Sequence, residues 1–70
     1  MTVYVLIRED QSEHGYIDAS IVGIFQEERT AKEQQEAECI RVRDEGLRLE
    51  DDDSDGDWQV SIYVEHHHLS

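Results

Sequence analysis

The 70-residue chain has no proline, one cysteine and only six basic residues. The missing proline excludes a proline-rich linker. The lone cysteine, Cys39, excludes an internal disulfide and is compatible with a reducing cytoplasm. No apolar run approaches the roughly 20 residues of a membrane-spanning helix, and the first residues lack the basic start of a signal peptide. We therefore expect one small domain over residues 1–70, located in the cytoplasm and without a membrane partner.

What the chain has in excess is acid: 18 acidic residues against six basic ones, for a formal charge of −12. This sign disfavours direct binding to nucleic acid or anionic lipid and favours a partner with a basic surface. The densest stretch is Glu50–Asp57, in which six of eight residues are carboxylates. Such a block is typical of a solvated loop and often serves as an interaction surface. Solubility alone is the simpler explanation.

Hydrophobic periodicity predicts three strands and one helix. Short β-rich runs at Thr2–Ile7, Ile17–Phe25 and Trp58–Glu65 indicate strands, and the first is apolar on both faces, as in a central strand. Helix-forming residues fill Gln26–Glu45, and Leu47–Leu49 is a candidate for a short extra strand. We expect an α+β fold, ββα followed by one or two strands, with a mostly antiparallel three- to four-stranded sheet covered by one helix.

Alternation along the strands also predicts which side chains face the core. The last strand is expected to pack one face against the first strand and the helix, with Trp58, Val60, Ile62 and Val64 facing Val3, Val5 and Ile7. The helix offers a weak apolar stripe of Ala31, Gln35, Cys39 and Val42.

Local signals refine this outline. Gly23 indicates a bulge or a close approach of the helix, and Gly46 predicts a helix stop in which Leu47 contacts Val42. The tail at His66–Ser70 is expected to be frayed.

Two metal sites are conceivable from ligand types, and both patterns are incomplete. The residues Asp51, Asp53, Asp55 and Gly56 match the D-x-D-x-D-G opening of a calcium loop, but the twelfth position is Ile62 rather than a bidentate glutamate. Weak calcium binding by this stretch remains an alternative. The residues His14, Cys39 and His66–His68 include zinc-ligand types, yet consecutive histidines alternate in direction along an extended tail. We therefore predict no metal site and no cofactor.

Catalytic patterns are absent from the sequence. Cys39 lies among glutamates in the predicted helix, an environment that disfavours the reactive thiolate. There is no supported Ser/His/Asp arrangement and no glycine-rich phosphate loop. We predict that the chain is not an enzyme.

The opening Tyr-Val-Leu-Ile-Arg-Glu-Asp at 4–10 and the ending Trp-Gln-Val-Ser-Ile-Tyr-Val-Glu at 58–65 resemble those of phage-encoded anti-CRISPR proteins, in particular type I-C inhibitors. The short length, acidity and lone cysteine resemble that class as well. The segments Tyr-Val-Leu and Gly-Ile-Phe and the glutamate-rich helix with Ala31 also resemble a family of small uncharacterised bacterial domains. Anti-CRISPR proteins share no common fold, so no site residues carry over. The resemblance implies action in the cytoplasm of a host bacterial cell, on the DNA-binding, PAM-reading surface of a Cascade subunit, with the large subunit as a candidate.

The acid density is compatible with such mimicry, because duplex DNA carries about one negative charge per 1.7 Å of axis. The leading hypothesis is an acidic inhibitor that mimics DNA and blocks the nucleic-acid-binding surface of a CRISPR effector. The alternative is a regulatory or immunity-type module for a basic protein partner. The predicted partner-binding residues are Glu50, Asp51, Asp52, Asp53, Asp55 and Asp57 first, Glu9, Asp10 and Glu13 second, and Glu33 and Glu36 in reserve. In a ββαββ roll the turn at Arg8–Tyr16 and the stretch Glu50–Asp57 would lie at opposite ends, so only one cluster could dominate.

Overall fold

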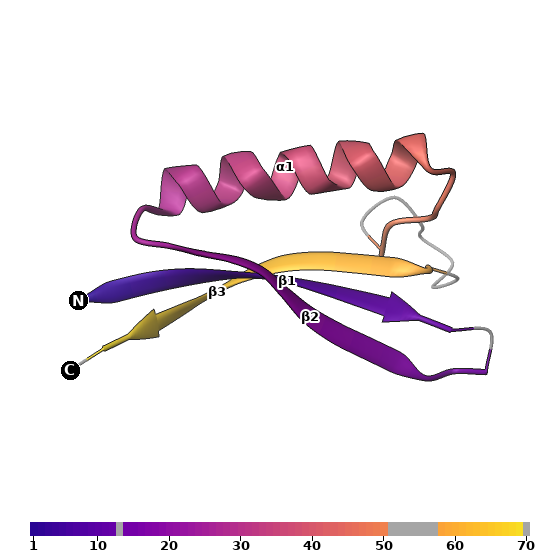
Figure 1. The fold of residues 1–70 in the computed structure, drawn as a ribbon, viewed down its shortest axis with the longest axis horizontal. Helices are drawn as coiled ribbons and strands as arrows, with labels where there is room; N and C mark the ends of the chain where they lie inside the picture. The colour runs from indigo at the N-terminus through magenta and orange to yellow at the C-terminus, as the bar shows by residue number, and fades with distance from the viewer. Residues whose placement is uncertain (13, 51–57, 70) are drawn as a thin grey trace.

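A computed structural model describes residues 1–12, 14–50 and 58–69 of the chain. The strands are β1 (Thr2–Gln11), β2 (Ile17–Phe25) and β3 (Val60–His68), and the helix α1 (Glu28–Asp44) lies between β2 and β3 in the chain. The strands form one antiparallel sheet in the order β2-β1-β3, and α1 lies along one side of it (Figure 1). This confirms the predicted α+β fold and the central position of the first strand.

Two strands differ in their bounds from the sequence prediction. Strand β1 continues four residues beyond Ile7, and β3 begins at Val60 and runs on to His68. The prediction of a frayed tail was therefore wrong for its histidines. They pair with the start of β1, and the Leu69 amide donates a hydrogen bond to the Met1 carbonyl at 2.6 Å. Backbone pairing of this kind does not depend on side-chain polarity, so alternation alone could not locate the end of the strand.

The helix ends as the sequence predicted. Gly46 has a positive φ of 81°, which glycine adopts at little cost. The Leu47 amide donates to the Val42 carbonyl at 3.1 Å, and the Gly46 amide donates to the Arg43 carbonyl at 3.0 Å. These two bonds define a Schellman ending, and Leu47 packs against the core cluster that contains Val42. The chain is thereby turned back toward the start of β3.

The core lies between α1 and the sheet and is small. Its buried members are Leu6, Val42, Leu49, Val60 and Ile62, and Phe25, Cys39, Leu47 and Val64 pack around them. The prediction that the last strand turns an apolar face toward the helix is confirmed for its two buried residues, which are at most 6% exposed.

The predicted partners on the first strand were wrong. Leu6 pairs with Val64, so Leu6 shares their face of the sheet. Because side chains alternate along a strand, Val3, Val5 and Ile7 lie on the opposite side, away from α1. Beyond Leu6, the helix-facing positions of β1 are occupied by Arg8 and Asp10. The apolar pattern did not predict a charged pair on this face.

The bulge suggested by Gly23 is present. The pairing of β1 with β2 shifts register between Leu6 and Ile7, which leaves Val22 as an extra residue. A Cβ atom at Gly23 would come within 2.8 Å of the Phe25 ring, so it is this ring rather than the helix that approaches closely. Of the candidate strand Leu47–Leu49, only Leu49 forms a bridge, a parallel one to Val60.

Replacing Ile62 by Asp should unfold the domain. The side chain is 6% exposed, and an unpaired buried carboxylate costs about 3–5 kcal/mol against a typical stability of about 5–15 kcal/mol. The matched control is Ile40→Asp, because Ile40 is 49% exposed on α1. Urea unfolding followed by circular dichroism should show a large loss for Ile62→Asp and a small change for Ile40→Asp. Equal losses in the two variants would contradict this account of the core.

Candidate protein-interaction surface

The β1–β2 turn and the two residues that flank the aspartate-rich stretch lie at the same end of the sheet. The Gln11 amide donates to the Gln59 carbonyl at 2.8 Å, which joins the end of β1 to the residue before β3. Glu50 and Trp58, which flank the aspartate-rich stretch, are therefore at the end that also carries the β1–β2 turn (Figure 1). The arrangement at opposite ends, expected for a ββαββ roll, does not apply to this ββαβ fold, because β3 runs antiparallel to β1 and starts where β1 finishes. We call this end of the sheet, with residues 9–18, Glu50 and Trp58, the hairpin end.

The predicted acid Asp10 is held by a base of the same strand. The guanidinium of Arg8 donates to Asp10 from Nε at 3.1 and 3.2 Å and from Nη2 at 3.0 Å. These hydrogen bonds raise the pKa of Arg8 above its ordinary value. The charge of Asp10 is thus largely neutralised inside the molecule, which lowers its value for an external partner.

The predicted acid Glu9 points to the side of the sheet away from α1. Its Oε1 accepts a hydrogen bond of 2.8 Å from the phenol of Tyr63, which lies on the neighbouring strand β3. This bond to a carboxylate raises the pKa of the Tyr63 phenol. The hydrogen bond fixes the direction of the carboxylate. Glu9 forms no ion pair with a base among the described residues.

Glu50 is exposed, and its carboxylate accepts a hydrogen bond from the hydroxyl of the buried Ser61. Asp18 is exposed at the start of β2, opposite Asp10 in the register, and belongs to the same end. The remaining loop acids of the prediction, Glu13, Asp51, Asp52, Asp53, Asp55 and Asp57, lie outside the described residues. The calcium-like opening falls there as well, while its twelfth position, Ile62, is buried in β3.

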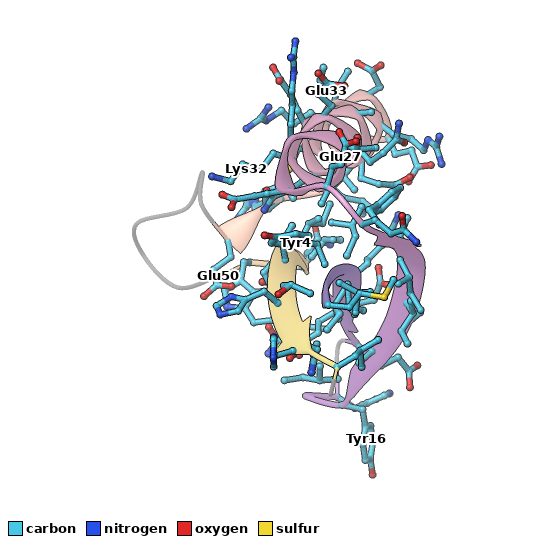
Figure 2. All side chains as sticks on the ribbon, turned by 90° about the vertical axis from the view of Figure 1, so that its left-hand side faces the viewer. Tyr4, Tyr16, Glu27, Lys32, Glu33 and Glu50 are labelled. Atoms are coloured by element: carbon cyan, nitrogen blue, oxygen red, sulfur yellow. The ribbon has the colours of Figure 1, made fainter. Side chains whose placement is uncertain are left out.

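The reserve acids lie on the helix, on the opposite side of the molecule from Tyr16 (Figure 2). Glu33 forms an exposed pair with Arg29 at 3.3 Å, four residues earlier. A similar pair joins Lys32 to Glu28 at 2.9 Å, and its hydrogen bond lowers the pKa of Glu28 and raises that of Lys32. Glu36 is exposed and has no ion pair within the part of the chain that the structure describes. Paired helix acids of this kind form an ordinary solvated face.

One acid of the helix, which the sequence analysis did not single out, is buried. Glu38 is 8% exposed and lies between two bases, with Arg41 Nη1 at 2.8 Å from Oε1 and Arg8 Nη1 at 3.6 Å from Oε2. Together with Asp10 they form a neutral chain of two acids and two bases that links α1 to the central strand. A signal was present in the sequence: Glu38 sits three and four residues from Gln35 and Val42 of the predicted apolar stripe.

The six bases of the chain do not offset the remaining acids. Arg8, Arg29, Lys32 and Arg41 each pair with a named carboxylate, and Arg43 and Arg48 also have partners. Each of the six bases thus has an interaction within the molecule, and the net charge of the chain stays at −12. Within residues 1–12, 14–50 and 58–69, every buried side-chain nitrogen and oxygen atom has a hydrogen-bond partner.

The described residues form a shallow depression and no cluster of metal ligands. A shallow depression of about 300 Å³ is lined by Tyr4, Glu28, Lys32, Val64 and His66, and its acid and base are paired with each other. Nowhere in the described ranges do three metal-ligating side chains gather. No described helix is long and apolar enough to cross a membrane.

Comparison with known proteins gives no match for this chain. No family model, no curated protein and no solved structure matches it. The resemblance to anti-CRISPR proteins is therefore neither supported nor opposed by these comparisons, and a function has to be argued from the surface itself.

Replacing Glu38 by Gln should destabilise the domain by about 1–3 kcal/mol, because the substitution leaves Arg8 and Arg41 with a weakened partner in a largely buried site. Glu36→Gln removes the same charge from the exposed side of the same helix and should change the free energy of unfolding by less than about 0.5 kcal/mol. Chemical denaturation of both variants measures the difference. If both variants lose equally, the buried ion pair does not hold the helix to the sheet.

Proposed function

We propose that this chain is a binding protein, not an enzyme, and that the acids of its hairpin end contact the basic, nucleic-acid-binding surface of a protein partner. In this proposal the acids take the place of DNA phosphates. The partner we propose is a Cascade subunit of a CRISPR effector, on the resemblance described above. The observation that supports the proposal is that Glu9 and Asp18, which flank the β1–β2 turn, and the exposed Glu50, far apart in sequence, lie at one end of the sheet.

The convergence matters because charge density decides electrostatic recognition. At physiological ionic strength charges are screened beyond about 8 Å, so two separate clusters would act independently and one combined cluster acts together. Glu9, Asp18 and Glu50 carry negative charge at the hairpin end, and none of them forms an ion pair with a base among the described residues. The aspartates between Glu50 and Trp58 follow directly in the sequence. A lysine- and arginine-lined DNA site is complementary to such a surface.

Competition with DNA tests the proposal directly. A labelled duplex carrying the PAM is bound to purified type I-C Cascade, and its fluorescence anisotropy is followed as the chain is added. We expect the chain to displace the duplex, with an affinity that falls as NaCl rises from 50 to 300 mM. Binding to Cascade without displacement of DNA would favour the regulatory or immunity-type module. Failure to bind at low salt would remove Cascade as the partner.

Charge neutralisation identifies the surface. The variant Glu9→Gln/Asp18→Asn/Glu50→Gln removes three charges from the hairpin end and should lower the association rate about tenfold at low salt, together with its salt dependence. The matched variant Glu27→Gln/Glu33→Gln/Glu36→Gln removes three charges from the helix and should have a much smaller effect. Neutralising the five aspartates between Glu50 and Trp58 is a separate variant. Stopped-flow association at two salt concentrations measures all three.

A larger loss of association rate in the helix variant than in the hairpin-end variant would show that the partner binds α1. If all three variants bind and inhibit like the parent chain, the acids serve solubility and the proposal is wrong.

A further inference from the structure

Strand β2 presents an unprotected edge. It is an outer strand of the sheet, and its outer side pairs with no other strand among the described residues. Edge strands are commonly blocked by lysine, proline or a cover, but the range Ile17–Phe25 contains neither residue and only one charge, Asp18. The other outer strand, β3, is partly covered, because the amides of Gln59 and Val60 donate to the Arg48 carbonyl at 2.9 and 3.0 Å.

The same strand carries exposed apolar side chains. Ile17 is 53% exposed, Ile21 64% and Ile24 62%. Their register places them beside Gln11, Ile7 and Val5 on the side of the sheet that α1 does not cover, which we call the open face. Tyr16, at the foot of β2, extends away from α1 (Figure 2) and is 74% exposed. An open backbone edge and an open apolar face thus coincide on one strand.

This region is nearly neutral in a strongly acidic molecule. Among the described residues, the strand acids of the open face are Glu9 and Glu65, and Glu50 reaches this face through its hydrogen bond with Ser61. Glu9 accepts a hydrogen bond from Tyr63, and Glu65 lies 3.7 Å from the ring of His67, so both are on the side toward β3. A basic partner finds no acidic cluster along β2. A second copy of the chain meets a single acid on β2 itself, Asp18, because the charge of the neighbouring Asp10 is offset by Arg8.

We propose that two copies of this chain associate by antiparallel pairing of their β2 edges. The regular part of β2, Ile17–Ile21, precedes the bulge and fits a pairing with Ala19 on the two-fold axis. Ile17 then lies opposite Ile21 of the second copy, and Asp18 lies opposite Ser20. Apolar residues pair on the open face and no like charges oppose one another on the other face.

This register also keeps the tips of the two β1–β2 turns apart, although Asp18 of each copy lies next to the axis. Because the strands are antiparallel, the β1–β2 turns point in opposite directions, each about five residues from the axis. At about 3.3 Å per residue the turns are about 30 Å apart along the strands, several times the screening length of about 8 Å at physiological ionic strength. The open faces of both copies become one continuous apolar surface on a six-stranded sheet.

Sedimentation equilibrium between about 10 µM and 1 mM protein tests the pairing, a range suited to the weak association of a small interface. We expect a monomer–dimer equilibrium that tightens at least threefold when NaCl rises from 50 to 500 mM, because salt screens the repulsion between two chains of charge −12. This dependence is opposite to that of the proposed partner contact, so one proposal can fail without the other. A monomer under all conditions overturns the pairing.

Substitutions at the exposed Ala19 test the register. Ala19→Lys and Ala19→Glu each place like charges opposite one another on the axis, so each variant alone should lose the dimer at least tenfold. An equimolar mixture of the two should restore it, and this rescue excludes misfolding as the cause. The control Ile40→Lys, on α1, should dimerise like the parent chain. Loss without rescue in the mixture, or equal loss in the control, overturns the proposed register.

Discussion

A single helix can cover only one face of a three-stranded sheet, and most properties of this molecule depend on that constraint. The core between α1 and the sheet has five buried apolar residues at its centre. A core of this size supplies little margin over the conformational entropy of 70 ordered residues. The remaining apolar side chains of β1 and β2 therefore lie on the open face, where burial requires another molecule.

Polar contacts, in addition to the small apolar core, hold the helix against the sheet. The helix is joined to the central strand by Glu38 between Arg8 and Arg41, and to β3 by the Gln35 side chain, which donates to the Ile62 carbonyl at 3.0 Å. Such contacts are weak as net stabilisers, because desolvation offsets much of the attraction. They are specific, however, since only one position of the helix satisfies all of these groups. The weak apolar stripe of α1 is thereby sufficient to fix its orientation.

The local structure was predictable from the sequence, whereas the assignment of faces was not. Alternation located β2 within its observed limits, and Gly46 with Leu47 predicted the helix ending, because both depend on neighbours in the chain. In β1 both faces are apolar, and the more β-branched face is the one left open. The helix-facing side of β1 could have been recognised only from the Arg8–Asp10 pair. That pair marks the helix-facing side because Arg8 also pairs with Glu38 of α1. Sequence pattern also could not bring the two acid-rich turns together, since that follows from the antiparallel order β2-β1-β3.

The fold separates two kinds of surface that the sequence mixes. Acids are found at the hairpin end and on the outer side of α1, whereas β2 beyond Asp18 carries no charged residue. Contacts with the first surface weaken as salt screens them, and contacts with the second strengthen as salt screens the repulsion between like chains. A molecule of this charge can therefore attract a basic partner at one end and still tolerate a copy of itself at an edge. Its net charge alone does not determine what it binds; the distribution of that charge over the three strands does.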